Sequence, residues 1–376
     1  MPVNILHLHS TFDLGGKEAR AVRLMNAFGD AARHTIVSAM PDNLGARARI
    51  EKGIRYEIAQ SAPSLTGKPS VARYEALARY MRRFDLVLTY NWGAMDAVMA
   101  RRIFAKGAPP LVHHEDGFNS DEARGLKPQR NMYRRLALGA AHALAVPSES
   151  LEWIALNTWK QPRGRVHRIA NGIATGLYAK PCDPKAIPGF VPNAKEIVIG
   201  AVAGLRAVKD LSTLVRAVGG VSARTRLVIV GEGPERETIR QAAAAMGIAD
   251  RLVLPGFLER PYRFVGLFDM LAVSSQSEQF PISVVEAMAA GLPIASFPVG
   301  DVPKMVAPEN APFITEHMGE VRLRDAIQAL AGDADLRKRV GAANQTKARA
   351  EYDEATMIAR YKALYEDALG RPGALG

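Results

Sequence analysis

Hydrophobic residues along the chain gather in short runs that alternate with longer segments of helical spacing. In the first half, five apolar runs are too short for helices and are expected to form buried strands. They cover residues 3–10, 34–40, 84–91, 109–115 and 141–148. Between them, segments such as 18–29 and 71–84 carry apolar residues every three or four positions. This alternation predicts a parallel sheet wrapped by helices.

A stretch rich in Gly and Pro, residues 168–196, interrupts this pattern, which then restarts. Such a composition marks a domain boundary, which we place near residues 172–195. Five further strands are predicted, at 197–204, 225–233, 251–257, 269–275 and 293–300, and an amphipathic helix at 353–369. The fold class is therefore α/β, with two doubly wound domains whose ligand is expected in a cleft at the carboxyl ends of the strands.

The length and composition agree with this prediction. A chain of 376 residues exceeds one ordinary core, and 48% hydrophobic with 23% charged residues is typical of a folded globular protein. The single Cys182 excludes an internal disulfide and suits a reducing compartment. No apolar run reaches the roughly 18 residues of a membrane-spanning helix, and the N-terminus lacks the pattern of a secretion signal. We therefore expect a cytoplasmic protein.

The net charge of +11 lies entirely in the first half. Residues 1–190 hold 27 Lys and Arg against 16 Asp and Glu, whereas the remaining residues hold 22 of each. Such a basic half could attract nucleic acid, an anionic membrane or a phosphorylated ligand, or simply keep the surface solvated. No zinc-finger, RNP or basic-zipper pattern accompanies it, so no nucleic-acid partner is expected.

Two candidate sites lie in the first half. Gly15 and Gly16 separate a predicted strand from a helix, where glycine lets the backbone approach a ligand and free N–H groups favour an anion. A tight turn without a ligand fits the same residues. His113 and His114 end another predicted strand. They could bind sugar hydroxyls or transfer protons, or be hydrogen-bonded parts of the structure, and adjacent strand residues point to opposite faces, which disfavours a shared metal ion.

Two more candidate ligand-binding segments follow predicted strands of the second half. Arg206 and Lys209 could neutralise a diphosphate or be merely solvated, and Asp210 is predicted to cap the helix that begins near Leu211. The segment VGEGPER lacks the third glycine of a dinucleotide fingerprint. Gly231 and Gly233 are therefore expected to form a strand-to-helix turn, with Pro234 and Glu235 in the first helical turn.

The segment EQFPISVVEAMAAGLP, residues 278–293, allows two interpretations. In one, Ser283 and Glu286 form the capping box of a helix and Glu278 is an ordinary loop carboxylate. In the other, the helix begins near Pro281, its N-terminus faces a phosphate, and both carboxylates accept hydrogen bonds from sugar hydroxyls.

This segment resembles the E-x7-E signature of retaining glycosyltransferases of family 4, which have the GT-B fold. The Gly-Gly loop near Glu18, Lys209 and the segments RIANGI, VIVGEGPER, VLPGF and YKALY resemble the same family, in the same order. The resemblance extends over nearly the whole chain. The departures are Gly204, where an arginine is common, and Ala170 and Ala174 in the segment that resembles the family's PNGID.

The resemblance implies two Rossmann-like domains: an acceptor-side domain of residues 1–172, to which a helix at 355–376 returns, and a nucleotide-sugar-binding domain of residues 196–354, joined by a linker at 173–195. It implies transfer of a sugar from a nucleotide-diphosphate sugar to a glycan or lipid-linked acceptor with retention of configuration, in polysaccharide or lipopolysaccharide synthesis. No metal and no other cofactor is expected. Peripheral association with an anionic membrane, at its inner face, is a further expectation.

By the same resemblance, Glu286 would hold the ribose diol, Glu278 the hydroxyls of the donor sugar, and Lys209 the diphosphate, with Arg206 nearby. Either His113 or His114 would act beside the donor sugar. The remaining implied donor-binding residues are Gly15, Gly16, Phe280, Pro281, Ile282 and Ser283. Two alternatives stay open: a sugar-nucleotide epimerase on the same fold, and a non-catalytic protein that binds sugar nucleotides.

Overall fold

The computed structural model describes residues 1–118, 122 and 125–376. The chain divides into two compact units. The first comprises residues 1–170 together with 357–376, and the second comprises residues 171–356. The segment 173–195, expected as a linker, thus lies in the second unit.

The first unit is built on a seven-stranded sheet of order β3-β2-β1-β4-β5-β6-β7, in which every pairing is parallel. Its strands are β1 (Val3–His9), β2 (Ala32–Ser38), β3 (Tyr56–Ile58), β4 (Leu86–Tyr90), β5 (Leu111–His114), β6 (Ala143–Val146) and β7 (Val166–Arg168). The five predicted strands are confirmed. The two that were not predicted, β3 and β7, are three-residue strands at the two edges.

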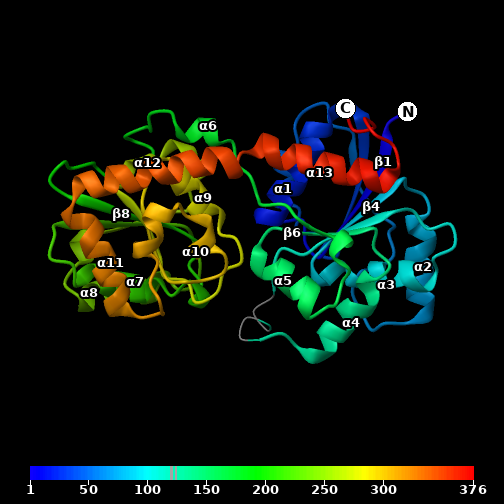
Figure 1. Cartoon of the computed structure of the whole chain (residues 1–376), viewed down its shortest axis with the longest axis horizontal. Helices are drawn as coiled ribbons and strands as arrows, with labels where there is room; N and C mark the ends of the chain where they lie inside the picture. The colour runs from blue at the N-terminus through cyan, green and yellow to red at the C-terminus, as the bar shows by residue number, and fades with distance from the viewer. Residues whose placement is uncertain (119–121, 123–124) are drawn as a thin grey trace. The chain divides into compact units, whose positions relative to one another are not determined.

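Helices cover both faces of this sheet (Figure 1). They are α1 (Gly16–Phe28), α2 (Val71–Met81), α3 (Met95–Ile103), α4 (Pro128–Leu138), α5 (Glu149–Asn157) and most of α13 (Glu354–Leu369). Because side chains alternate along a strand, Leu6 and Leu8 pack with α2 to α5, whereas Val3 and Ile5 pack with α1 and α13. Burial on both faces explains why these strands are continuous apolar runs.

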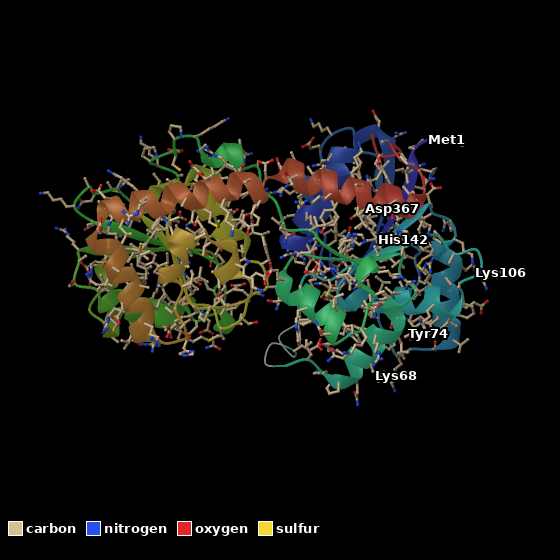
Figure 2. The ribbon with its side chains drawn as sticks, in the orientation of Figure 1. Met1, Lys68, Tyr74, Lys106, His142 and Asp367 are labelled. Atoms are coloured by element: carbon tan, nitrogen blue, oxygen red, sulfur yellow. The ribbon has the colours of Figure 1, made fainter. Side chains whose placement is uncertain are left out.

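The predicted amphipathic helix at the end of the chain is α13, which packs on the first unit. Tyr361 and Tyr365 are fully buried there, and the Tyr365 hydroxyl lies 2.7 Å from Nε2 of His114. A second contact joins Asp367 of α13 and His142 before β6, whose Oδ2 and Nε2 are 2.8 Å apart; Figure 2 labels both residues. These contacts join the end of the sequence to strands formed by its first half.

The second unit contains a five-stranded parallel sheet of order β10-β9-β8-β11-β12. Its strands are β8 (Ile197–Val202), β9 (Thr225–Val230), β10 (Leu252–Gly256), β11 (Met270–Val273) and β12 (Ile294–Ser296), and all five were predicted. The helices are α6 (Thr175–Tyr178), α7 (Leu211–Gly219), α8 (Arg236–Ala245), α9 (Ile282–Ala289), α10 (Val302–Met305), α11 (Glu320–Gly332) and α12 (Ala334–Glu351). Strand order reverses between β8 and β11, and ligands of open α/β sheets bind at such a point.

Gly231 and Gly233 form the predicted strand-to-helix turn, both with positive φ. A Cβ atom at Gly231 would lie 1.9 Å from the carbonyl oxygen of Ala203, and one at Gly233 would lie 2.3 Å from that of Leu205. These glycines therefore allow the loops after β8 and β9 to touch. Helix α8 begins only at Arg236, so placing Pro234 and Glu235 in its first turn was wrong by two residues.

In the part of the chain that the structure describes, no helix combines the length and the apolar character that crossing a bilayer requires.

Candidate active site

Lys209 and Glu278 meet at the carboxyl ends of two neighbouring strands of the second unit. Lys209 follows β8 and Glu278 follows β11, the two strands at which the strand order reverses. The ammonium nitrogen of Lys209 is 2.5 Å from Oε1 of Glu278. The structure thus brings together two predicted site residues that are 69 positions apart.

Hydrogen bonds connect the loop after β8 to the loop after β11. The Ser274 hydroxyl donates to the carbonyl oxygen of Lys209 at 2.9 Å, and the backbone N–H of Gln276 donates to the carbonyl oxygen of Val208 at 2.9 Å. The Ser275 hydroxyl donates to Oε1 of Glu278 at 2.7 Å. Glu278 is therefore oriented by both a cation and a hydroxyl group.

Asp210 occupies the predicted N-cap position of α7, but its side chain does not cap the helix. Its backbone is left-handed, with φ 48°, and its Oδ1 accepts a hydrogen bond from the Thr213 hydroxyl at 2.8 Å. The expected side-chain cap was therefore wrong, because the left-handed turn directs the carboxylate to a side chain rather than to a backbone N–H.

Helix α9 begins at Ile282, with Pro281 as its N-cap, and no side chain caps it. Ser283 lies inside the helix, so the capping-box interpretation of Ser283 and Glu286 is wrong. The first N–H groups of a helix have no partner within it and carry partial positive charge, which favours an anion. Glu286, in the second turn, accepts a hydrogen bond from the Tyr178 hydroxyl at 2.9 Å.

The backbone between β11 and α9 rests on Gly300, whose φ is 54°. A Cβ atom there would lie 2.5 Å from the carbonyl oxygen of Glu278 and 2.7 Å from that of Gln279. The Asp301 amide also donates to the Gln279 carbonyl at 3.0 Å. Glycine at position 300 thus permits the close approach that sets the position of Glu278.

The other predicted residues of this unit lie around the same loops. The Phe280 ring packs edge-on against Tyr352, with centroids 5.6 Å apart. Arg206 is exposed, and no ion pair of its side chain is found in the described part of the chain. Arg206 therefore stays apart from the Lys209–Glu278 pair.

In the first unit, the two histidines at the end of β5 differ in their hydrogen bonds. Both imidazole nitrogens of His114 are engaged, by the carbonyl oxygen of Thr89 at 3.1 Å and by the Tyr365 hydroxyl at 2.7 Å. Burial, followed by the Arg20 charge, lowers the pKa of His114 well below its usual value. His114 is accordingly a neutral, structurally bonded imidazole.

His113 uses only one nitrogen. Its Nδ1 lies 2.8 Å from the Thr89 hydroxyl, whereas its buried Nε2 has no hydrogen-bond partner within residues 1–118, 122 and 125–376. The nearest carboxylate oxygen, Oε2 of the buried Glu115, is 3.9 Å from Nε2. Glu115 itself lies 3.3 Å from Nε of Arg134. His113 thus has one buried imidazole nitrogen whose hydrogen-bonding capacity is not used by the described residues.

Gly15 is the N-cap of α1, with extended backbone. A Cβ atom there would lie 2.8 Å from Oε2 of the buried Glu18. Lys17 pairs with Glu18, and Arg20 pairs with Asp116 beyond β5. Gly15 and Gly16 are exposed at the start of this helix, whose first N–H groups no side chain caps.

No three His, Cys, Asp or Glu side chains within the described ranges are grouped as a metal site requires. Residues that sequence reasoning missed are Tyr178 and Ser275, which orient the two glutamates. Tyr178 gave no local signal, because its partner Glu286 is 108 positions away.

Two protein-family models match the chain one after the other. The model described as Glycosyltransferase Family 4 covers residues 14–177, and the model described as Glycosyl transferases group 1 covers residues 183–347.

Curated relatives match parts of the chain. The lipopolysaccharide core biosynthesis glycosyltransferase LpsD of Rhizobium meliloti is 27% identical over 194 residues, which are 52% of this chain and 56% of LpsD. The putative glycosyltransferase EpsF of Bacillus subtilis is 30% identical over 200 residues, half of each chain. The N-acetyl-alpha-D-glucosaminyl L-malate synthase of Bacillus anthracis is 22% identical over 56% of this chain and 55% of that enzyme. The chain thus spans about half the length of these relatives.

Solved structures match over nearly the full length. Anabaena HepE in complex with UDP aligns with a TM-score of 0.79 and 19% identity over 97% of this chain and all of that one. The lipopolysaccharide outer core galactosyltransferase WaaB aligns with a TM-score of 0.71 and 15% identity over 97% of this chain and 99% of that one. At such identities the similarity establishes the fold. With both family models matched in order and this fold, the chain belongs to the group 1, family 4 glycosyltransferases and has their GT-B architecture.

Proposed function

We propose that this protein transfers a sugar from a nucleotide-diphosphate sugar to an acceptor, with retention of anomeric configuration. The observation that carries the proposal is the Lys209–Glu278 pair beside the uncapped N-terminus of α9, with Glu286 in the second turn of that helix. A cation, a helix N-terminus and two carboxylates suit the diphosphate and the hydroxyl groups of such a donor.

Each group has a role in this proposal. Lys209 and the first N–H groups of α9 bind the diphosphate and stabilise the negative charge that develops as the sugar–phosphate bond breaks. Glu278 accepts hydrogen bonds from hydroxyls of the donor sugar, and Glu286 accepts them from the ribose diol. Phe280 to Ser283 supply the backbone around the sugar, and Arg206, Gly15 and Gly16 border the phosphates.

Glu278 is the partner of Lys209. Because an ammonium group has three donors, Lys209 can keep a bond to Glu278 and still contact a phosphate oxygen. The pair thus holds Lys209 in place, which avoids reorganisation during the reaction. We propose that no metal ion takes part, since these groups supply the positive charge that the leaving group needs.

Between the two histidines, we propose that His113 acts beside the donor sugar. Its Nε2 has no partner among the described residues, whereas both nitrogens of His114 are engaged. Retention by front-face attack, with the leaving phosphate accepting the acceptor's proton, is the course we propose.

For the acceptor, we propose a glycan or a lipid-linked glycan of cell-surface polysaccharide or lipopolysaccharide synthesis, handled by the first unit. The names of LpsD and WaaB support this class of acceptor. We place the reaction in the cytoplasm, at the inner face of the membrane, because all the excess positive charge lies in residues 1–190.

Helix α4 offers a surface for such an association. Met132 and Leu136, four positions apart and hence on one face, are 57% and 46% exposed, and Arg135 beside them is exposed as well. Apolar side chains flanked by a cation suit an anionic bilayer.

Vesicles with anionic lipid should sediment the protein at low salt. Less protein should sediment at high salt, and less should sediment when Met132 is replaced (Met132→Glu). Val321→Glu, an equally exposed position (55%) on α11, is the control. Binding that is absent or insensitive to salt would exclude this surface.

The transfer itself is tested by incubation with UDP-, GDP- and ADP-sugars, with and without candidate acceptors. We expect release of a nucleoside diphosphate that depends on the acceptor, and an NMR-detected product with the donor's anomeric configuration. Conversion of the donor sugar without an acceptor would favour an epimerase. Donor binding without turnover on any donor would favour a non-catalytic binding protein.

A further inference from the structure

Tyr178 contacts the signature glutamate from a segment far outside the signature. It ends the short helix α6, and its hydroxyl donates to Oε1 of Glu286 at 2.9 Å. The side chain is largely buried, with 8% of the residue exposed. Its ring packs edge-on against Tyr262, with centroids 6.2 Å apart and planes at 82°. The ring is therefore held by packing, and the hydroxyl has a fixed direction toward the carboxylate.

The chemistry of this contact suits a carboxylate that binds a diol. A carboxylate has about four acceptor positions on its two oxygens. Tyr178 contacts Oε1, and a carboxylate can keep such a bond while it accepts hydrogen bonds from two vicinal hydroxyls. A glutamate side chain loses considerable rotamer freedom when it is immobilised, and immobilising it before the ligand arrives lowers the cost of binding.

We propose that Tyr178 is a positioning residue that presets Glu286 to accept both ribose hydroxyls of the donor nucleotide. This inference rests on the role proposed for Glu286 above. Tyr178 acts through Glu286 and need not contact the donor. Recognition of the ribose would then depend on residue 178. This residue lies between the two family models, which match residues 14–177 and 183–347.

The test compares Tyr178→Phe with the wild type, using UDP, GDP or ADP, whichever binds, and the 2′,3′-dideoxy form of the same nucleotide. Phenylalanine keeps the ring and its packing and removes only the hydroxyl. Without this hydroxyl, Glu286 must be immobilised when the ligand binds, which should raise the Kd of the ribonucleotide roughly threefold to tenfold. The Kd of the dideoxy form should not change. With the donor, KM should rise by a similar factor while kcat changes little.

Tyr74→Phe is the matched control. Tyr74 is equally buried (7% exposed), and its hydroxyl lies 2.7 Å from that of Tyr133 in the first unit; Figure 2 labels its position. This variant loses a buried tyrosine hydroxyl as well, so any general loss of stability should be common to both. Only Tyr178→Phe should change the discrimination between ribose and dideoxyribose.

A double-mutant cycle with Glu286→Ala separates the possible failures. If Tyr178 acts through Glu286, Tyr178→Phe should have no further effect in the Glu286→Ala background. A full effect there, or an unchanged Kd in Tyr178→Phe while Glu286→Ala still weakens binding, would overturn the role of Tyr178 and leave the proposed function intact. If Glu286→Ala itself left ribonucleotide binding unchanged, the proposed role of Glu286 would fail, and this inference with it.

Discussion

Lys209 illustrates how a single side chain defines the candidate site. Its ammonium group lies where β8 and β11 end, 2.5 Å from a carboxylate oxygen of Glu278. Residues of both signs meet there because parallel strands expose their carboxyl ends at one edge of the sheet. A charge held in this way can stabilise a leaving diphosphate without first rearranging.

Replacing Lys209 with Met should therefore reduce kcat/KM by roughly 100-fold, in the range found for removing one preorganised electrostatic contact. Initial-rate measurements check this value. Lys195→Met, which alters an exposed lysine of the same unit, should leave the rate unchanged. Equal rates for Lys209→Met and the wild type would exclude Lys209 from the chemistry.

The two histidines of β5 give a second prediction at this scale. His113→Ala and His114→Ala should both lower the melting temperature, because each removes a buried hydrogen-bonded ring. Measured well below that temperature, transfer should slow at least roughly tenfold only in His113→Ala, the usual order for a group that takes part in proton transfer or electrostatic stabilisation. A slower His114→Ala with a normal His113→Ala would reverse the assignment.

At the scale of elements, the loop before α9 depends on contacts with the loop after β12. Gly300→Ala adds a Cβ atom 2.5 Å from the Glu278 carbonyl at a position with φ 54°. Gly247→Ala shares the positive φ, 66°, but has nothing within 4 Å of its added Cβ atom. Both variants should lose about 1 kcal/mol of stability from left-handed backbone strain, and Gly300→Ala should lose more, because its Cβ atom also clashes with two backbone carbonyls. Only Gly300→Ala should also weaken nucleotide binding, as titration calorimetry can show; equal binding in the two variants would contradict the role of this contact.

The sequence predicted elements better than their ends. The ten predicted strands lie within apolar runs, whereas the segments YEI and VHR, which form β3 and β7, contain charged or polar residues and do not form apolar runs. The start of α9 near Pro281 was predicted from proline chemistry. Ser and Asp are common helix-capping residues, but neither side chain caps a helix here. Ser283 lies inside α9, and Asp210 has a left-handed backbone. Tyr178 could not be found, since nothing local connects it to Glu286.

At the scale of the whole molecule, the two units differ in their histidines. Seven of the eight lie in residues 1–170, and His7, His9, His34 and His114 are buried there. Burial is the largest cause that lowers the pKa of each, and the pKa of His34 falls to about 4. The first unit thus contains buried, neutral imidazoles that become protonated at low pH only when the unit unfolds or pays the cost of a buried charge.

The direction in which pH changes the stability follows from the linkage between folding and proton binding. Between pH 6.5 and 4 the unfolded chain binds more protons than the folded one at these histidines, so stability falls as the pH falls. His34 alone should cost about 2 kcal/mol at pH 5. Melting followed at pH 7.5 and pH 5 should show the first unit losing more stability than the second. His34→Gln should flatten the pH dependence, and a stability that rises on acidification would contradict this picture.

The central claim is that the second unit binds the nucleoside diphosphate of the donor through Lys209 and Glu286. Isothermal titration of UDP, GDP and ADP into the wild type and into Glu286→Ala tests it most directly. We expect the wild type to bind at least one of the three, and Glu286→Ala to weaken that binding by roughly tenfold or more, because it removes a charged acceptor of two hydrogen bonds. Binding of none of the three nucleotides, or equal binding by both proteins, would contradict it.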